Sequence, residues 1–350
     1  MSQEAQRIAE FEEELRNTPY NKRTQHHIGL VKAKIANLKE KIEKKSKGKG
    51  ISKGFAVRKT GDATVVIVGY PSVGKSTLLN KLTSAKSKTA AYEFTTLDVI
   101  PGILEYEGAK IQLLDIPGVI EGASAGKGRG KEALSITRSA DLILILIDKE
   151  HQIGVIENEL YQAGFRLNQH KPDVKIRKTS KGGLAIDLPN SLNKETFIGI
   201  LKELGILNAE VIVRENITSE QLIDVILDNR TYIPSITVLN KIDLIKERTE
   251  CDIGISAEKG INLDKLKKLI FKKLSLIRVY CKEVGKKPDL ENPLLLKKGQ
   301  TVQDACQKLH RDFINKFRFV RIWGSSRFPG QKFNLNYELK DRDVMEVHLR

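Results

Sequence analysis

The sequence predicts an α/β protein. Its main domain is a mostly parallel sheet with helices on both faces, joined by an N-terminal helical hairpin, an inserted α+β subdomain and a small C-terminal domain. Three observations predict this. The runs "ATVVIVG", "ADLILILID" and "SITVLNKID" are continuously apolar, as in strands buried on both faces. Helical patterns alternate with them. Each run ends in polar residues, and ligands of such sheets bind at the strands' carboxyl ends.

The first 45 residues predict two helices separated by "NTPYN". Apolar residues recur at helical spacing in both of them, namely Ile8, Phe11 and Leu15, then Ile28, Val31, Ile35, Leu38 and Ile42. This hairpin is too small to bury its apolar stripe alone, so we expect it to pack on a neighbour. Residues 46–61 form a glycine-containing basic linker, either a solvated tether or a contact for RNA phosphates.

The main domain is expected to occupy residues 62–165 and 231–275, interrupted by the inserted subdomain at 166–230. Within the insertion, "KPDVKIRKTSKGGLAIDLPN" resembles a hairpin, and "LKELGI" ends a helix. Residues 276–350 form the C-terminal domain of short strands around one helix, with Thr301 as its N-cap. In "KFRFVRIW" the strand alternation predicts one aromatic or apolar face and one basic face, which is either a packed sheet or an RNA-docking surface.

The stretch "GYPSVGKST" lies after a strand and before a helix, the context that a phosphate-binding P-loop requires. Glycines let successive backbone N–H groups surround the phosphates, and the helix N-terminus adds partial positive charge. Lys75 is expected to reach the β- and γ-phosphates, and the Ser76 hydroxyl to bind Mg²⁺. The predicted nucleotide-binding residues of this loop are Gly69, Tyr70, Pro71, Ser72, Val73, Gly74, Lys75, Ser76 and Thr77.

Two further motifs complete the predicted site. In "DIPG", Asp115 is expected to hold Mg²⁺ through water, and the Gly118 N–H to meet the γ-phosphate. In "NKID", Asp243 can accept from two guanine donors that adenine lacks, which favours GTP over ATP. The remaining residues expected around the base are Asn240, Lys241, Ser256 and Ala257, the last two from "SAEKG".

These motifs, with "YEFTTLDVIPG", "DIPGVIEGASAGKGRG" and "RIWGSS", resemble the developmentally regulated GTP-binding protein family of the Obg group, over nearly the whole chain. The resemblance implies a P-loop GTPase domain, an insertion like ribosomal protein S5 and a β-grasp-like TGS domain. It implies that Thr96 (or Thr95) of switch I closes on Mg²⁺, and that residues 119–130 form switch II. It also implies a link to ribosomes and a dedicated stabilising partner protein. Lys75, Thr96 and Gly118 would be the catalytic residues.

Hydrolysis is expected to be slow without help. Ras-like enzymes orient the attacking water with a glutamine just after the DxxG glycine, whereas this chain has Val119, which cannot hydrogen-bond water. The missing help could come from a potassium ion near Ser72, from a partner, or from Arg129 in switch II. Two functions follow as hypotheses: a GTPase switch in translation, or a slowly hydrolysing or non-hydrolysing RNA-binding scaffold or chaperone.

Composition restricts the partners. The formal net charge is +16, which favours nucleic acid, and we expect the ribosome or another RNA rather than DNA. No apolar run is long enough to span a bilayer, so no membrane association is expected. Three scattered cysteines form no disulfide framework, which suits a cytoplasmic location.

Overall fold

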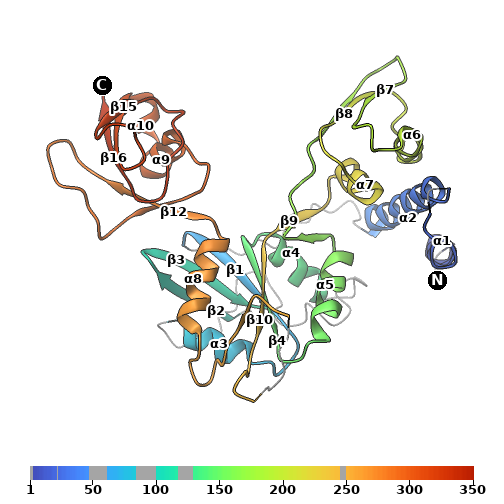
Figure 1. Ribbon diagram of the computed structural model, residues 1–350, viewed down its shortest axis with the longest axis horizontal. Coiled ribbons are helices and arrows are strands. Elements are labelled where there is room, and N and C mark those ends of the chain that lie inside the picture. The colour runs from blue at the N-terminus through green and yellow to red at the C-terminus, as the bar shows by residue number, and fades with distance from the viewer. Residues whose placement is uncertain (1–2, 22, 47–60, 84–99, 117–128, 245–249) are drawn as a thin grey trace. The chain divides into compact units, whose positions relative to one another are not determined.

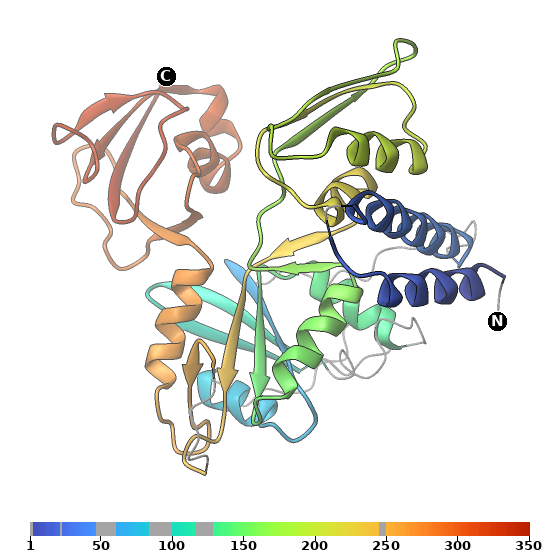
Figure 2. The same cartoon turned by 45° about the vertical axis from the view of Figure 1, so that its right-hand side comes forward.

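The computed structural model describes the chain apart from residues 1–2, 22, 47–60, 84–99, 117–128 and 245–249 (Figures 1 and 2). The chain divides into two compact units. The first combines Met1–Gly54 with Gly164–Tyr232, and the second combines Phe55–Ala163 with Ile233–Arg350. Both units are therefore built from segments that are distant in sequence. Among the described residues, no helix is long and apolar enough to cross a membrane.

The second unit contains the main sheet, with strand order β11-β10-β4-β1-β3-β2. Its strands are β1 (Ala63–Val68), β2 (Ile100–Tyr106), β3 (Ala109–Asp115), β4 (Leu142–Ile147), β10 (Ser235–Leu239) and β11 (Ile253–Gly254). All neighbours pair in parallel except β2, which runs antiparallel to β3 at the edge. Every residue of β1 and β4 is buried, as continuous apolar runs predict. Strand β2 was not predicted, because Pro101 and Gly102 interrupt its pattern.

Helices cover both faces of this sheet (Figure 1). The helices α3 (Lys75–Leu82) and α8 (Leu263–Lys273) bury Leu78, Leu79, Leu266 and Ile270 in one core cluster with β1, β3, β4 and β10. The other face is covered by α4 (Arg129–Arg138) and α5 (Gln152–Gln162). The predicted α/β class of the main domain is confirmed. Because five strands run in parallel, their carboxyl ends meet at one edge, where the predicted motifs lie.

The rest of the second unit is a five-stranded sheet, with order β13-β12-β16-β14-β15. Its strands are β12 (Leu276–Cys281), β13 (Leu294–Lys297), β14 (Phe317–Trp323), β15 (Gln331–Phe333) and β16 (Asp343–Leu349). The helix α9 (Val302–Leu309) buries Val302, Ala305 and Cys306 against it, and α10 (Asp312–Asn315) follows. Thr301 caps α9 in a capping box with Asp304, as predicted.

The predicted face pattern of β14 is wrong. Val320 and Ile322 are the residues that point into the core, while Phe319, Arg321 and Trp323 share the opposite face. The pairing with β16 is regular from Phe319 to Trp323, and ordinary alternation over these residues places Arg321 on the same face as the two aromatic residues. Aromatic and basic side chains therefore lie together, and Lys332 Nζ lies 4.6 Å from the ring centre of Phe319.

The first unit joins the N-terminal helices to the insertion. The elements are α1 (Gln3–Asn17), α2 (Gln25–Ser46), β5 (Phe165–Leu167), β6 (Val174–Lys178), β7 (Leu184–Asp187), α6 (Lys194–Glu203), β8 (Ala209–Val213), α7 (Ser219–Leu227) and β9 (Thr231–Ile233). Helix α2 packs on α6 and α7. A Cβ added to Gly29 would lie 2.9 Å from Thr196, and one added to Gly199 would lie 2.7 Å from Leu30, so glycines permit the close approach of α2 and α6.

The predicted hairpin of the insertion is also wrong. Strands β6 and β7 do not pair with each other, because β8 lies between them in the order β6-β8-β7. Strand β8 pairs antiparallel with β6 and parallel with β7. Its residues Ala209, Val211 and Val213 are buried, whereas the alternating residues of β6 and β7 are only partly covered. The most buried strand therefore takes the central position.

Candidate functional site

The loop between β1 and α3 has a backbone that requires glycine at two positions. Gly74 has φ of 98°, in the left-handed region, and an added Cβ would lie 2.4 Å from Nδ2 of Asn240. A Cβ on Gly69 would lie 2.4 Å from the carbonyl oxygen of Leu146 in β4. Ser72 also has positive φ, at 63°. The loop therefore lies tightly against the neighbouring strand and against the loop that follows β10.

Lys75 lies across this loop. Its Nζ donates to the carbonyl oxygens of Gly69, at 3.0 Å, and Tyr70, at 2.9 Å. Burial lowers the pKa of Lys75, and the Asp115 carboxylate opposes that shift. Two neutral carbonyls are modest partners for an ammonium group, so a phosphate oxygen placed here would be a stronger acceptor.

Ser76 and Asp115 come together beside the loop. The Ser76 hydroxyl donates to Oδ2 of Asp115 at 3.0 Å. The other oxygen of Asp115, Oδ1, is buried and has no hydrogen-bond partner among the described residues. Burial raises the pKa of Asp115, while the bond from Ser76 and the charge of Lys75 lower it. An unsatisfied buried carboxylate oxygen next to a hydroxyl suits a hydrated divalent cation, because a cation-bound water could donate to it.

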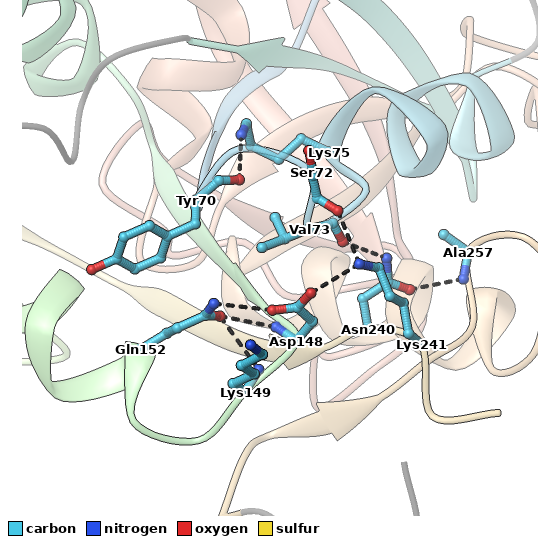
Figure 3. A network of polar contacts seen from close by, with 10 residues as sticks. All are labelled: Tyr70, Ser72, Val73, Lys75, Asp148, Lys149, Gln152, Asn240, Lys241 and Ala257. Atoms are coloured by element: carbon cyan, nitrogen blue, oxygen red, sulfur yellow. Dashed lines mark hydrogen bonds and ion pairs between the residues drawn. The ribbon is translucent and has the colours of Figure 1, made fainter. Parts of the chain in front are cut away.

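Asn240 connects three segments of the site (Figure 3). Its Nδ2 donates to the carbonyl oxygen of Val73 at 2.8 Å, and its Oδ1 accepts from the Ala257 N–H at 3.0 Å. Its own N–H donates to the carbonyl of Ile147, at 2.7 Å. The residue is 3% exposed. Asn240 therefore fixes the P-loop, the end of β4 and the "SA" loop relative to one another.

Lys241 makes a second connection, which includes two residues outside the predicted site, Asp148 and Gln152 (Figure 3). Its Nζ donates to the carbonyl of Ser72 at 2.9 Å and pairs with Asp148 at 2.8 Å. Gln152 holds Asp148 from the other side, with Nε2 3.0 Å from Oδ1. Burial acts to raise the pKa of Asp148, but the bonds from Lys241 and Gln152 outweigh it, so that pKa lies below its usual range. The signal available in the sequence was the acid directly after the strand "LILILI".

Asp243, the residue expected to read the base, lies in the next turn. Its side chain accepts from Ser256 and pairs with Lys259 at 3.2 Å, and these contacts lower its pKa. The carboxylate is therefore ionised and is held by side chains of the "SAEKG" loop. Ser256 is 1% exposed, so its hydroxyl acts on Asp243 from within the protein.

The other residues of the predicted site divide into two groups. Tyr70 packs partly against the core, and Pro71 and Thr77 are exposed on the loop and on α3. Thr95, Thr96, Gly118 and Val119 lie outside the described residues. Arg129 begins α4, but its side chain is not described. The structure thus brings together the P-loop, Asp115 and the two motifs around the base, and leaves the switch residues as predictions.

Comparison with known families agrees with this arrangement. A family model described as "50S ribosome-binding GTPase" matches residues 64–178, and one described as the C-terminal region of that domain matches residues 181–276. A TGS domain model matches residues 277–349.

Individual relatives match over nearly the whole chain. A GTP-binding protein of Methanocaldococcus jannaschii is 51% identical, covering 98% of this chain and 92% of that protein. Developmentally-regulated GTP-binding protein 1 of Xenopus laevis is 44% identical, covering 99% of each, and developmentally-regulated GTP-binding protein 2 of Homo sapiens is 40% identical, covering 98% of each. Among solved structures, a GTP binding protein from Pyrococcus horikoshii aligns over 82% of this chain and all of that one, with 14% identity and a TM-score of 0.42.

Proposed function

Because the chain belongs to the developmentally regulated GTP-binding protein family, we propose that it hydrolyses GTP to GDP and phosphate as a ribosome-associated switch in translation. The observation that carries the proposal is the convergence of four separate segments at one edge of the sheet. The P-loop, the end of β3, the end of β4 and the loop after β10 are linked there by Asn240, Lys241 and Ser76.

The proposed roles follow from the geometry. Backbone N–H groups of Ser72–Lys75 and the N-terminus of α3 would surround the phosphates. Lys75 would exchange its two carbonyl partners for β- and γ-phosphate oxygens. Asp243 would accept from guanine, while Asn240 holds the loops that border the base. Adenine offers the carboxylate no matching donor pair, which accounts for a preference for GTP.

Mg²⁺ fits the same residues. Ser76 would supply a hydroxyl ligand, and the unpartnered Oδ1 of Asp115 would accept from a water on the ion. Thr96 would complete the site from switch I. The bound ion would neutralise charge that develops on the β- and γ-phosphate oxygens. Ser72 offers an oxygen near the phosphates, so a potassium ion there is part of the proposal.

A second candidate function rests on Val119. Because valine cannot orient water, the chain could bind GTP and act as an RNA-binding scaffold or chaperone with little turnover. The family description as ribosome-binding and the net charge of +16 suit both candidates. Both candidate functions include a cytoplasmic location and a stabilising partner protein.

Steady-state GTP turnover separates the two functions. We would measure it with Mg²⁺ in potassium and in sodium buffers, each with and without purified ribosomes. A rise in turnover with ribosomes supports the switch. GTP binding with negligible turnover under all four conditions supports the scaffold. If turnover without ribosomes is rapid, and as fast in sodium as in potassium, hydrolysis does not depend on an ion or a partner. That result contradicts the expectation from Val119.

A further inference from the structure

A groove of about 690 Å³ lies in the second unit, away from the nucleotide site. Its walls come from the C-terminal half of α8, the turn between β2 and β3, the start of β12, the turn after β13 and the segment before β16. The aromatic rings on its floor already pack on other groups. Tyr106 and Phe271 meet edge to face at 5.8 Å, and the Arg278 guanidinium lies 5.6 Å from the Phe271 ring centre.

Both acidic residues that line the groove are paired with one arginine. Arg278 makes two bonds to Asp341, with Nε–Oδ1 at 3.0 Å and Nη2–Oδ2 at 2.6 Å, and its Nη1 donates to Glu107. The Arg278 side chain is only 10% exposed. Its hydrogen bonds to Asp341 hold the pKa of that carboxyl below its usual range. The two carboxylates are therefore committed to Arg278 and oppose an anionic ligand only weakly.

Four further cations line the groove. Lys268 and Lys272, one helical turn apart on α8, face it together with Lys298 and Arg342. All four are exposed. Within the described residues Lys268, Lys272 and Lys298 form no ion pair, whereas the charge of Arg342 acts on Asp341. Other exposed lysines of this unit, such as Lys297 and Lys308, are paired with Asp141 and Asp62. Lys268, Lys272 and Lys298 therefore bring three positive charges without a paired carboxylate to one groove.

We propose that this groove binds the phosphodiester backbone of RNA. Several cations along one channel suit a chain of regularly spaced anions better than a single anion. The floor favours the backbone over the bases, because the Phe271 face is already covered by Arg278 and leaves little room for stacking. The choice of RNA rests on the proposed ribosome-linked function, whereas the site itself rests on the charges and the groove.

The test compares two triple variants of the full chain with wild type. The groove variant is Lys268→Gln, Lys272→Gln, Lys298→Gln. The control is Lys175→Gln, Lys178→Gln, Lys181→Gln, which removes the same charge from exposed positions in the first unit. A short fluorescent single-stranded RNA is titrated over a range of salt concentrations, with poly-glutamate as competitor. Circular dichroism checks that all three proteins are folded, and GTP turnover with ribosomes is measured in parallel.

The groove variant should bind the RNA at least about tenfold more weakly at low salt, and its slope of log K against log salt should be shallower by roughly 2. The control should match wild type. Equal losses in both variants, or a loss in neither, would overturn the proposal. Displacement of the RNA by poly-glutamate at matched charge would indicate an acidic protein partner instead. If wild type shows no GTP turnover with ribosomes, the proposed switch function is wrong, whether or not the groove variant binds RNA more weakly.

Discussion

At the scale of single residues, the absence of a side chain at Gly74 lets the Asn240 amide approach the P-loop closely. Its backbone is left-handed, and a methyl group added to it would lie only 2.4 Å from Asn240 Nδ2. We predict that Gly74→Ala displaces the Asn240 amide from Val73 and abolishes tight GTP binding, which calorimetric titration would detect. Retention of wild-type affinity would contradict the close packing described here.

Gly154 supplies the matched control. It lies within α5, and nothing lies within 4 Å of the Cβ that alanine would add. Gly154→Ala should leave GTP binding unchanged and stabilise the protein by about 0.5–1 kcal/mol, since alanine is the better helix former. Urea denaturation would measure that gain. If this variant also lost nucleotide, the effect of Gly74→Ala could not be assigned to its contact with Asn240.

Asp243 should determine the choice of base. Asp243→Ala removes the acceptor for two guanine donors, so GTP affinity should fall by about 10- to 100-fold, as expected for charged hydrogen bonds worth roughly 1.5–3 kcal/mol. Weak ATP binding should hardly change. Lys259→Ala removes only the exposed partner of that carboxylate and should lower GTP affinity by less than about fivefold. A parallel loss of GTP and ATP affinity would refute the role of Asp243 in base recognition.

At the scale of elements, a buried charge cluster links β5, α7 and the residue that precedes β9. Asp224 is 5% exposed and binds Arg166 at 2.6 Å and Arg230 at 2.8 Å. Asp224→Ala would leave buried guanidinium charge without its carboxylate. We predict a loss of about 3–5 kcal/mol in the stability of the first unit, measured by urea denaturation.

The exposed pair Arg177–Glu210 is the control for that loss. Its atoms are 3.9 Å apart, and both side chains are largely exposed. Glu210→Ala should change stability by no more than about 1 kcal/mol. A comparable loss in both variants would mean that burial does not govern the strength of these pairs.

Cys306 on α9 gives a pH-dependent prediction. Burial raises the pKa of this thiol to about 11, from 9.0. The unfolded chain therefore loses the proton first as the pH rises, so stability should fall by about 1 kcal/mol per unit between pH 9 and 11. The difference in unfolding free energy between wild type and Cys306→Ala isolates this contribution. A difference that is constant between pH 8 and 11 would contradict it.

The elements also show what the sequence could predict. The strands β1 and β4 were predictable because six consecutive apolar residues leave no alternative to full burial. The P-loop and Asp243 were predicted from local patterns alone. The faces of β14 were predicted wrongly although the information was present, since alternation from Phe319 places Arg321 between two aromatic residues on one face. The pairing of Lys241 with Asp148 was not predicted from the sequence. These two residues follow different strands, and they come close only when β4 and β10 pair in the sheet.

At the scale of the whole molecule, the N-terminal helices belong with the insertion. Ile28, Val31, Ala33 and Ile35 of α2 are buried in the first unit. Deleting residues 1–46 should therefore expose apolar surface on α6 and α7 and speed amide exchange there. GTP binding should persist, since the nucleotide site draws its described residues from the second unit. Hydrogen exchange with and without GTP would check both outcomes, and loss of GTP binding would contradict this division.

This division also sets a constraint on how the chain is made. A ribosome releases α2 long before α6, its packing partner, and the roughly 150 residues between them take on the order of ten seconds to translate. The main sheet is also incomplete during this time, because β10 follows the insertion in the chain. During that interval the face of α2 that packs on α6 and α7 has no partner, although α1 is already present. The nascent chain is therefore exposed to aggregation for longer than a protein whose domains are continuous, and refolding of the complete chain would not reproduce that risk.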